Sequence, residues 1–404
     1  MISIEQLVAE GRAFLDATVP VRTTSDDEFV WGEGSDRINV LEEISRDHLD
    51  EVVAQAKAYA AARFDAGLGW IDGPVEYGGR GLPVEHAIAF SELEAHYELP
   101  NLAPLTIAIG FIGPALLATA SADLKERYLP QLYRGDVIMC QLFSEPNAGS
   151  DLTAASTRAV RDGDEWVING QKVWTSSAHA ADLGLCVTRT DPNVPKHKGL
   201  TTFLVDMHAP GVDIRPLKQM TGEANFNEVF LTDVRVPDSH RVGDVNAGFG
   251  VIITTLGNER SIATRRSNVG RGIGPFERIA GVVHEYGDPS DANTRQRLAQ
   301  VYVLERIREL QHERWRQATK PGETPGPEMM LGKLHNTVLN RQLVPLLTEV
   351  LGPRLDTDTG EWGAYAWTEY VLSTPGMRIG GGTEEIVRNT VAERVLGLPK
   401  EPKS

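Results

Sequence analysis

Residues 141–152 read QLFSEPNAGSDL, in which an expected strand runs directly into a segment rich in turn-forming residues. The turn segment carries two small hydroxyl residues, Ser144 and Ser150, and the flexible pair Ala148 and Gly149. Backbone N–H groups and hydroxyls there could donate hydrogen bonds to a flat polar ring or to a phosphate. Composition alone equally allows an ordinary turn built from Pro, Asn, Gly and Ser. The stretch therefore raises the hypothesis of a binding loop and leaves the ordinary turn open.

Two further stretches carry unusual patterns. Residues 168–184, INGQKVWTSSAHAADLG, place Trp174 among polar residues on an expected strand. Such a tryptophan would suit a wall for an aromatic cofactor, although a core tryptophan is the commoner case. Residues 378–389, RIGGGTEEIVRN, put three glycines before a threonine, two acids and an expected helix. The glycines either let N–H groups approach a phosphate at the helix start or leave room for another group.

Length and composition bound the class of protein. The chain has 404 residues, 41% of them hydrophobic and 24% charged, which predicts a globular protein of roughly two or three domains. No apolar run approaches the roughly 18 residues of a membrane span, and the amphipathic N-terminus does not resemble a signal peptide, so we expect a cytoplasmic protein. The net charge of −16 argues against nucleic acid or an anionic membrane as the main partner. Cys140 and Cys186 have no metal-ligand or disulfide-scaffold spacing, so no metal is expected.

The hydrophobic pattern changes character twice along the chain. Residues 1–134 have helical periods broken by the turn EYGGRGLP, and we expect an N-terminal α-helical domain. Residues 135–246 alternate short strand-like runs with turns, which predicts a central β domain. Residues 247–404 return to long helical periods, as in TRQRLAQVYVLERIRELQHERWRQA, and predict a C-terminal helical domain. The proline- and glycine-rich segment 319–328 is expected to connect two of its helices.

Taken together, these motifs resemble those of the acyl-CoA dehydrogenase family. The resemblance rests on EYGGRG, FSEPNAGSDL, NGQKVWTSS, FLTDVRVP and GGGTEEIVRN followed by AERVLGLP, in this order over most of the chain. It implies an α+β fold with an N-terminal α-helical domain, a central β-barrel-like domain and a C-terminal four-helix bundle. It also implies an FAD enzyme that oxidises an acyl-CoA to its 2,3-enoyl form. Electrons would then pass to an acceptor such as an electron-transfer flavoprotein.

The resemblance assigns cofactor residues position by position. Ser150 also falls near the CoA, and the glycine-rich loop meets the phosphates and ribose of the adenine half of FAD. The residues assigned to the flavin are Gln141, Phe143, Ser144, Gly149, Ser150, Trp174 and Ser176, and those assigned to the adenine half are Thr383 and Glu385.

The catalytic base is expected on a helix upstream of the glycine-rich loop. Many relatives carry a glutamate two residues before the threonine, where this chain has Gly381. Isovaleryl- and long-chain-type relatives place it on a helix just before an arginine, and TTLGNERSIA puts Glu259 before Arg260 at that position. On a helix, Glu259 shares a face with Ile252 and Leu256, so desolvation would raise its pKa and strengthen it as a base. The alternative is a surface glutamate paired with Arg260, which is otherwise expected near the substrate.

Gly381 keeps a backbone N–H although it lacks a carboxylate. Relatives use this amide, with a ribityl hydroxyl of the flavin, to hold the thioester oxygen, so an enolate-like oxyanion could still be stabilised. The missing side chain also leaves volume beside the α-carbon. Branched or bulky acyl groups, a steroid side chain among them, are therefore the expected substrates.

Three departures from the family pattern bear on assembly. The R-x-x-F-G segment that reaches a neighbour's FAD is replaced by GVVHEYG at 281–287, and Q-x-x-G-G-x-G survives only as EVLGP at 349–353. The aspartate expected near CoA is Gly257. Such a chain resembles the base-bearing subunit of actinobacterial steroid-type enzymes built as α2β2 with a second acyl-CoA dehydrogenase-like chain. A homotetramer or homodimer stays possible if Arg295 or Arg297 substitutes for the missing contact.

Other functions remain compatible with the same motifs. The chain could be a non-catalytic or partner subunit of a heteromeric acyl-CoA dehydrogenase, a flavin oxidase or monooxygenase on the same fold, or a plain CoA-binding protein. The sequence does not decide the acyl chain, the electron acceptor or the pathway.

Overall fold

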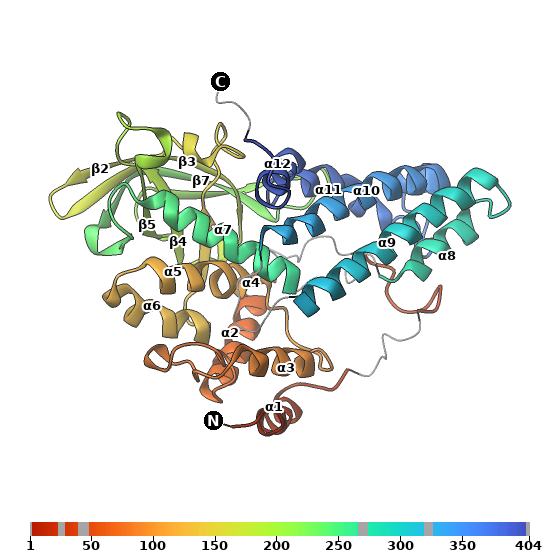
Figure 1. Ribbon diagram of the computed structural model, residues 1–404, viewed down its shortest axis with the longest axis horizontal. Helices are drawn as coiled ribbons and strands as arrows, with labels where there is room; N and C mark the ends of the chain where they lie inside the picture. Colours follow the sequence, from red (N-terminus) through yellow and green to blue (C-terminus); the bar gives the residue numbers. More distant parts are fainter. Residues whose placement is uncertain (1, 23–28, 39–47, 266–273, 319–325, 401–404) are drawn as a thin grey trace. The chain divides into compact units, whose positions relative to one another are not determined.

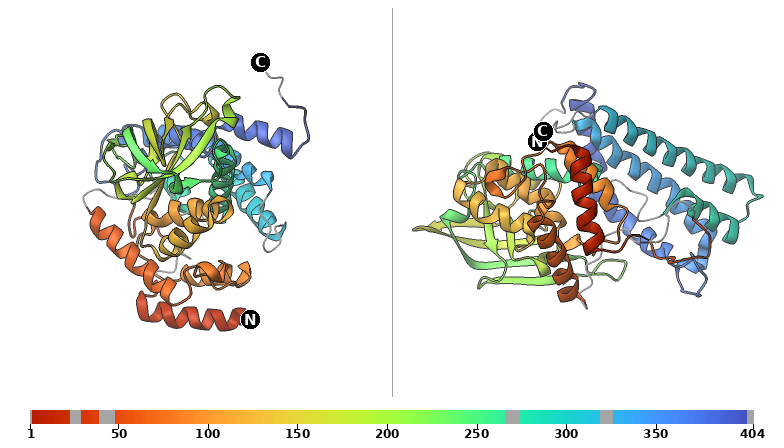
Figure 2. Two further views of the ribbon diagram at one scale, coloured as in Figure 1. Left: turned by 90° about the vertical axis from the view of Figure 1, so that its left-hand side faces the viewer. Right: turned by 90° about the horizontal axis from the view of Figure 1, so that it is seen from below.

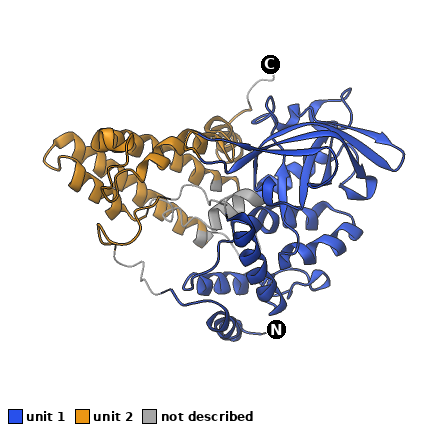
Figure 3. Ribbon diagram, turned by 180° about the vertical axis from the view of Figure 1, so that it is seen from behind, with its two compact units in different colours: residues 1–24, 43–219, 223–259 blue, residues 25–42, 220–222, 260–404 orange. Residues whose placement is uncertain are grey.

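The computed structural model describes residues 2–22, 29–38, 48–265, 274–318 and 326–400. The side chains of residues 258–265, 316, 318 and 329 are not described. The chain divides into two compact units, shown in different colours in Figure 3. The first comprises Met1–Thr24, Glu43–Gln219 and Glu223–Glu259, and the second comprises Ser25–Glu42, Met220–Gly222 and Arg260–Ser404.

The first unit begins with helices, as the sequence predicts. α1 starts at a capping box in which Ser3 and Gln6 bond each other's backbone N–H groups, and it buries Leu7, Gly11 and Leu15 along one face. A side chain at Gly11 would meet the ring of Phe90, so glycine allows α1 and α3 to pack closely. The helices are α1 (Ile4–Thr18), α2 (Leu49–Asp65), α3 (Val84–Glu94), α4 (Ala103–Ile107), α5 (Gly113–Thr119) and α6 (Ala122–Arg134), with a π-helical turn at Ala108–Ile112 joining α4 to α5 (Figure 1).

An eight-stranded sheet follows in the same unit. Its strand order is β6-β7-β3-β2-β4-β5-β8, and β1 pairs in parallel with β4. β2 and β3 form a hairpin through Gly163 and Asp164, where Gly163 has a φ of 63°. The strands are β1 (Met139–Leu142), β2 (Arg158–Asp162), β3 (Glu165–Ser176), β4 (Leu183–Arg189), β5 (Leu200–Asp206), β6 (Val212–Leu217), β7 (Phe226–Pro237) and β8 (Arg241–Val242).

The helix α7 (Gly248–Arg265) comes after the sheet, and the division between the two units falls within it. Val251, Ile252 and Thr255 are buried, and Leu256 packs against the hydrophobic core that contains Val251 and Ile252. This part of α7 therefore presents an apolar face to the first unit, as the spacing of its apolar residues predicts.

The second unit is helical and is centred on α10. This helix contacts α8, α9, α11 and α12, and Figures 1 and 2 show α9 and α10 running side by side. Leu343, Leu347 and Trp367 are fully buried in its core. The helices are α8 (Phe276–Tyr286), α9 (Ala292–Ala318), α10 (Met330–Leu351), α11 (Trp367–Ile379) and α12 (Glu384–Arg394).

A segment from near the N-terminus completes this helical unit. We call residues 29–38 the strap. Trp31 lies edge-on to Trp362 with ring centroids 4.9 Å apart, and Ile38 is 1% exposed within the core. Arg278 of α8 donates a hydrogen bond to the carbonyl of Arg37. The strap is thus part of the second unit, although α1 and α2 on either side of it belong to the first.

Candidate functional site

The loop after β1 is held against β3 by backbone hydrogen bonds. Glu145 and Ala148 exchange two N–H···O bonds of 3.0 Å, which closes a tight turn. Val173 N donates to the carbonyl of Ser144 at 2.9 Å. The structure thereby brings Ser144 next to the strand that carries Trp174, so two motifs that the sequence analysis treats separately form one surface.

The residues of this loop that are predicted to bind the flavin differ in exposure. Phe143 is buried, Gln141 and Ser144 are half-buried, and Gly149 and Ser150 are exposed. A side chain added at Gly149 would meet no atom within 4 Å. Within the first unit, no neighbouring protein atom would obstruct a side chain at position 149, so steric fit there does not require a glycine.

Trp174 is an exposed aromatic residue on a strained backbone. Its φ is 59° and the residue is 57% exposed, and its ring makes a T-shaped contact with Phe226 at 5.7 Å between ring centroids. The pairing of β3 with β7 shifts register between Lys172 and Thr175, so Trp174 lies in a β-bulge. The Thr175 Oγ1 atom is buried without a hydrogen-bond partner among the described residues, and Ser176 is half-buried. This donor set and the open aromatic face fit a flat polar ring such as the flavin.

A buried ion pair that the sequence analysis did not identify underlies this surface. Lys172 Nζ donates to Glu145 Oε1 at 2.8 Å and to the carbonyl of Phe143 at 3.1 Å. The same carboxylate accepts from the backbone N–H groups of Ser156 at 2.7 Å and Thr157 at 2.9 Å. Burial by itself raises the pKa of Glu145, but the charge and hydrogen bond of Lys172, together with hydrogen bonds from Ser156 and Thr157, outweigh burial and lower the pKa to about 2. The sequence signal that could have revealed this pair is a lysine, Lys172, inside an expected strand.

The glycine-rich loop belongs to the second unit and leads into α12, as the sequence predicts. Gly381 and Gly382 have φ values of 69° and 99°, a conformation that glycine adopts without a steric penalty. Thr383 caps the helix, its Oγ1 accepting from Ile386 N at 3.3 Å. Glu385 is exposed. The predicted adenine-side residues thus lie at the start of α12, Thr383 as its cap and Glu385 in its first turn.

Beside this loop, one buried carboxylate meets three arginines. The side chain of Glu384 is 4% exposed and lies 2.7 Å from Arg341 and 3.6 Å from Arg378, and it also accepts a hydrogen bond from Arg388. The hydrogen bond from Arg388 is the main cause of the lowered pKa of Glu384, and the other two arginines add to it. Lys333 donates to the carbonyl of Gly380, so cations surround the start of the loop. The sequence analysis assigned no role to Glu384.

The predicted base can be placed only at the level of the backbone. Glu259 and Arg260 lie within the helix α7, but their side chains are outside the described part of the chain. On the same helical face, Ile252 is 1% exposed and Leu256 is half-buried. A side chain at Gly257 would meet no atom within 4 Å. The apolar residues expected on the helical face of Glu259 are therefore present. The contacts of Glu259 itself stay a prediction.

The segment 281–287, where the family contact is missing, forms the second half of α8 and the residue after it. The Tyr286 hydroxyl donates to the carbonyl of Trp362 at 2.7 Å, and the guanidinium of Arg354 lies 4.9 Å from the centre of the Tyr286 ring. Gly281 faces the ring of Trp31 in the strap. These side chains are therefore engaged within their own unit.

The two arginines considered as substitutes also have partners in their own chain. Arg295 donates to the carbonyl of Ser290 at 2.6 Å, and Arg297 forms an exposed ion pair with Glu349. Exposed pairs of this kind contribute about 1 kcal/mol or less, so Arg297 could leave Glu349 at little cost.

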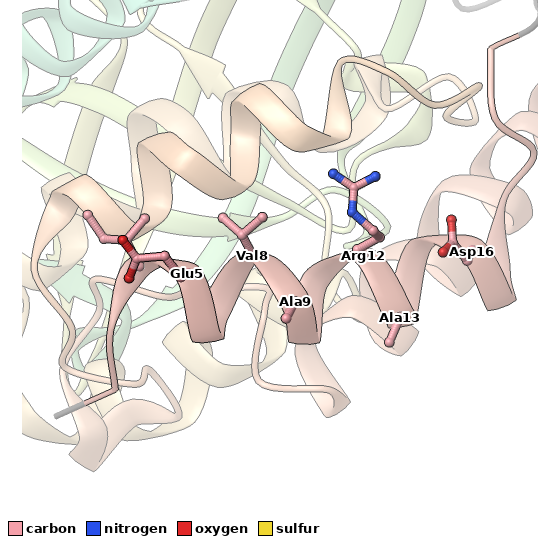
Figure 4. A pocket seen from close by; sticks show the side chains of 7 residues that line it. Glu5, Val8, Ala9, Arg12, Ala13 and Asp16 are labelled. Carbon is pink, nitrogen blue, oxygen red and sulfur yellow. The ribbon is translucent and has the colours of Figure 1, made fainter.

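A groove on the first unit lies along the outer side of α1 and contains none of the predicted site residues. Figure 4 shows the side chains that line it; they are Ile4, Glu5, Val8, Ala9, Arg12, Ala13 and Asp16. Within the described residues, no cluster of metal-ligating side chains occurs and no helix is long and apolar enough to cross a membrane. Cys140 and Cys186 are both buried free thiols.

Family models of all three acyl-CoA dehydrogenase domains match this chain. The N-terminal domain model matches residues 39–136, the middle domain model residues 140–234 and the C-terminal domain model residues 246–396. The helical, β-sheet and helical regions follow in the same order. The chain belongs to the acyl-CoA dehydrogenase family, whose members are generally FAD-dependent oxidoreductases, and the family and fold predicted from the motifs are confirmed.

Mycobacterial proteins are among its relatives. Acyl-CoA dehydrogenase FadE34 of Mycobacterium tuberculosis is 40% identical over 339 residues, a match that covers 83% of this chain but only 45% of FadE34. The matched region therefore spans less than half the length of that relative. Acyl-CoA dehydrogenase IpdE1 of the same organism is 36% identical over 365 residues, covering 89% of this chain and 91% of IpdE1.

Solved structures of heteromeric type resemble the chain over nearly its whole length. The Tcur3481-Tcur3483 steroid ACAD matches with a TM-score of 0.71 and 27% identity, covering 98% of each chain. The ChsE4-ChsE5 complex from Mycobacterium tuberculosis matches with a TM-score of 0.70 and 25% identity, covering 99% of this chain and 100% of that chain.

Proposed function

We propose that this chain is an FAD-dependent acyl-CoA dehydrogenase that introduces a double bond between the α and β carbons of a CoA thioester. The observation that carries the proposal is the joint surface of the β1 loop and Trp174, a residue that is 57% exposed on a strained backbone. The half-buried hydroxyls of Ser144 and Ser176 add polar groups to this aromatic wall. When bound, FAD would supply the acceptor for the hydride that leaves the β-carbon.

Within this proposal, each residue of the chain has a defined role. Glu259 takes the α-proton, and its position in the sequence places it on the same helical face as Ile252 and Leu256, a face whose apolar character would strengthen a carboxylate base. The N–H of Gly381 donates to the thioester oxygen as negative charge develops there. Thr383 and Glu385 hold the adenine half of the cofactor, and Ser150 lies near the CoA. Arg260 lies near the substrate.

The proposed substrate has a branched or bulky acyl group, with a steroid side chain as the favoured class. The absence of a side chain at Gly381 supports this, because it leaves volume beside the α-carbon. The similarity to a protein described as a steroid ACAD supports the same class. A straight short-chain thioester would leave that volume unfilled and should react more slowly.

We propose a heteromeric assembly with a second acyl-CoA dehydrogenase-like chain, and an electron-transfer flavoprotein as the acceptor. Support for the heteromer comes from the segment 281–287, which lacks the arginine and phenylalanine of the family contact and whose Tyr286 is engaged with Trp362 and Arg354. The similarity to a chain of the ChsE4-ChsE5 complex, whose description names two proteins, supports the same proposal.

The deciding experiment compares the reduction of bound FAD in wild type and Glu259→Gln. The protein, with any partner chain it requires, is mixed anaerobically with straight, branched and steroid-side-chain CoA esters, and flavin bleaching is followed. Removing the base should slow bleaching by about 10²- to 10⁴-fold while substrate and FAD still bind. Glu277→Gln, an exposed glutamate on α8, is the matched control and should bleach at the wild-type rate.

Two results would count against the proposal. Unchanged bleaching in Glu259→Gln would remove this residue as the base. A wild-type protein that binds FAD but is not bleached by any thioester would favour a non-catalytic subunit, whereas consumption of oxygen with turnover would favour an oxidase or monooxygenase.

A further inference from the structure

We propose that the buried ion pair of Glu145 and Lys172 is a positioning device that holds Trp174 in its exposed, strained conformation for the flavin ring. This inference rests on the proposed function, because it assumes that a flavin occupies the surface beside Trp174. It adds two residues that the family resemblance had not assigned, and it gives them a role in the geometry of the site.

The first step is that the pair joins three separate segments. Lys172 belongs to β3, Glu145 to the loop after β1, and the carboxylate of Glu145 also bonds the N–H groups of Ser156 and Thr157 at the approach to β2. Lys172 additionally bonds the carbonyl of Phe143. Lys172 is 0% exposed and Glu145 is 5% exposed, so water does not compete for these bonds.

The second step is that Trp174 is fixed from both sides along the chain. On its N-terminal side, Lys172 is bonded to Phe143 and the N–H of Val173 to the carbonyl of Ser144. On its C-terminal side, the carbonyl of Thr175 accepts from Asn227, which is fully buried. Trp174 lies in the bulge between these anchors and adopts the left-handed backbone conformation there.

The third step concerns what maintains the strain. A bulky residue with a positive φ persists only when the surrounding structure over-determines it. Trp174 is more than half exposed and its ring meets that of Phe226 in a T-shaped arrangement, so its own packing is only partial. The anchors on either side must therefore hold it, and the Glu145–Lys172 pair is the part of the N-terminal anchor that consists of side chains. Losing the pair should let Trp174 relax away from the position that a ring would contact.

The test uses Lys172→Met and Glu145→Gln, together with the double variant Glu145→Gln/Lys172→Met. The double variant removes both charges, so it avoids the unpaired buried charge that could prevent either single variant from folding. Arg63→Met is the matched control, because it breaks another largely buried ion pair, with Glu94, in the helices of the same unit.

Two readouts separate positioning from stability. In the apoprotein, the fluorescence of Trp174, obtained by subtracting a Trp174→Phe variant, should change its emission and its quenching by iodide when the pair is lost. In the reconstituted protein, with its partner chain if one is required, FAD affinity should fall by about 10- to 100-fold, the range that supporting residues contribute at metal sites. The flavin absorbance bands should shift as well. Arg63→Met should change thermal stability without altering either readout.

The outcomes distinguish this inference from the proposed function. If the wild-type complex does not bind FAD, the proposed function fails. If the wild type binds FAD, and the folded double variant keeps the wild-type FAD affinity, flavin spectrum and Trp174 fluorescence, the pair is only structural and the inference is overturned. Altered Trp174 fluorescence together with weakened FAD binding in the double variant supports it.

Discussion

Replacing Gly281 with alanine should destabilise α8, although the same change at an unobstructed helical glycine stabilises a helix. In a helix interior, alanine is favoured over glycine by about 1 kcal/mol. At Gly281, however, an added Cβ would lie 2.2 Å from Cε3 and 2.7 Å from Cζ3 of Trp31. These atoms belong to a rigid ring whose centroid is 4.9 Å from that of Trp362. The ring cannot yield without losing its contacts.

The size of the effect follows from these two opposing terms. Overpacking a well-filled site costs about 1–3 kcal/mol, and disturbing the Trp31–Trp362 pair adds about 0.5–1.5 kcal/mol. After the gain of about 1 kcal/mol in helix propensity, we expect Gly281→Ala to lower the stability of α8 by about 0.5–3.5 kcal/mol. In a Trp31→Ala background the obstruction is absent, so the same change should stabilise α8 by up to about 1 kcal/mol.

Hydrogen exchange measured by mass spectrometry on peptides from α8 gives the local opening free energy in all four proteins of this cycle. Gly376→Ala on α11 is the control, because a side chain there would meet no atom within 4 Å, and it should stabilise its helix. The reasoning is refuted if Gly281→Ala stabilises α8 in the native background, or if its effect is the same with and without Trp31.

Three further predictions concern the site. Gly381→Glu should lose activity on bulky thioesters relative to Gly381→Ala, which carries the same backbone strain at a φ of 69° without a carboxylate. Equal rates of the two variants on bulky thioesters would contradict the argument that Gly381 leaves volume for the acyl group. The pKa of Glu145 is about 2 in the folded protein against an ordinary 4.5, so its contribution to stability is complete above about pH 4.5 and is lost as the pH falls toward 2. The stability difference between wild type and Glu145→Gln should therefore be constant from pH 7 to about pH 5 and shrink in more acidic solution, as urea unfolding would measure. Expressed alone, the chain should bind FAD poorly, and a homo-oligomer with one tightly held FAD per chain, by mass and absorbance, would rule out the need for a partner.

Periodicity predicted most of the fold, because its signals are local. The helix Ala122–Arg134 lies in the region for which helical periods predict helices, and Ser121 and Gly135 cap its two ends. The strand Val212–Leu217 was not predicted: it lies at one edge of the sheet, and its alternation of apolar and polar residues lasts only from Val212 to Arg215 before Pro216 interrupts it.

The site was predictable in its parts and not in its connections. Motif order indicated Ser144 and Trp174, but the contact between their segments depends on the pairing of distant strands, which periodicity does not encode. Lys172 is a charged residue at a fully buried position, and composition-based reasoning places such residues on the surface. Its partner Glu145 became recognisable only when the fold brought the two side chains to 2.8 Å.

The strap has a consequence for the order in which this chain can fold. Arg278 bonds the carbonyl of Arg37 across 241 positions of sequence, and Ile38 lies in a core made, apart from Trp31, by residues from 276 onward. Closing so long a loop is slow compared with forming local helices. During synthesis, the strap must wait until most of the chain has emerged from the ribosome before its aromatic side chains find their partners. A fragment that begins at α8 would likewise expose the surface that Trp31 and Ile38 cover, so the helical unit is discontinuous in sequence and cannot be excised as a C-terminal piece.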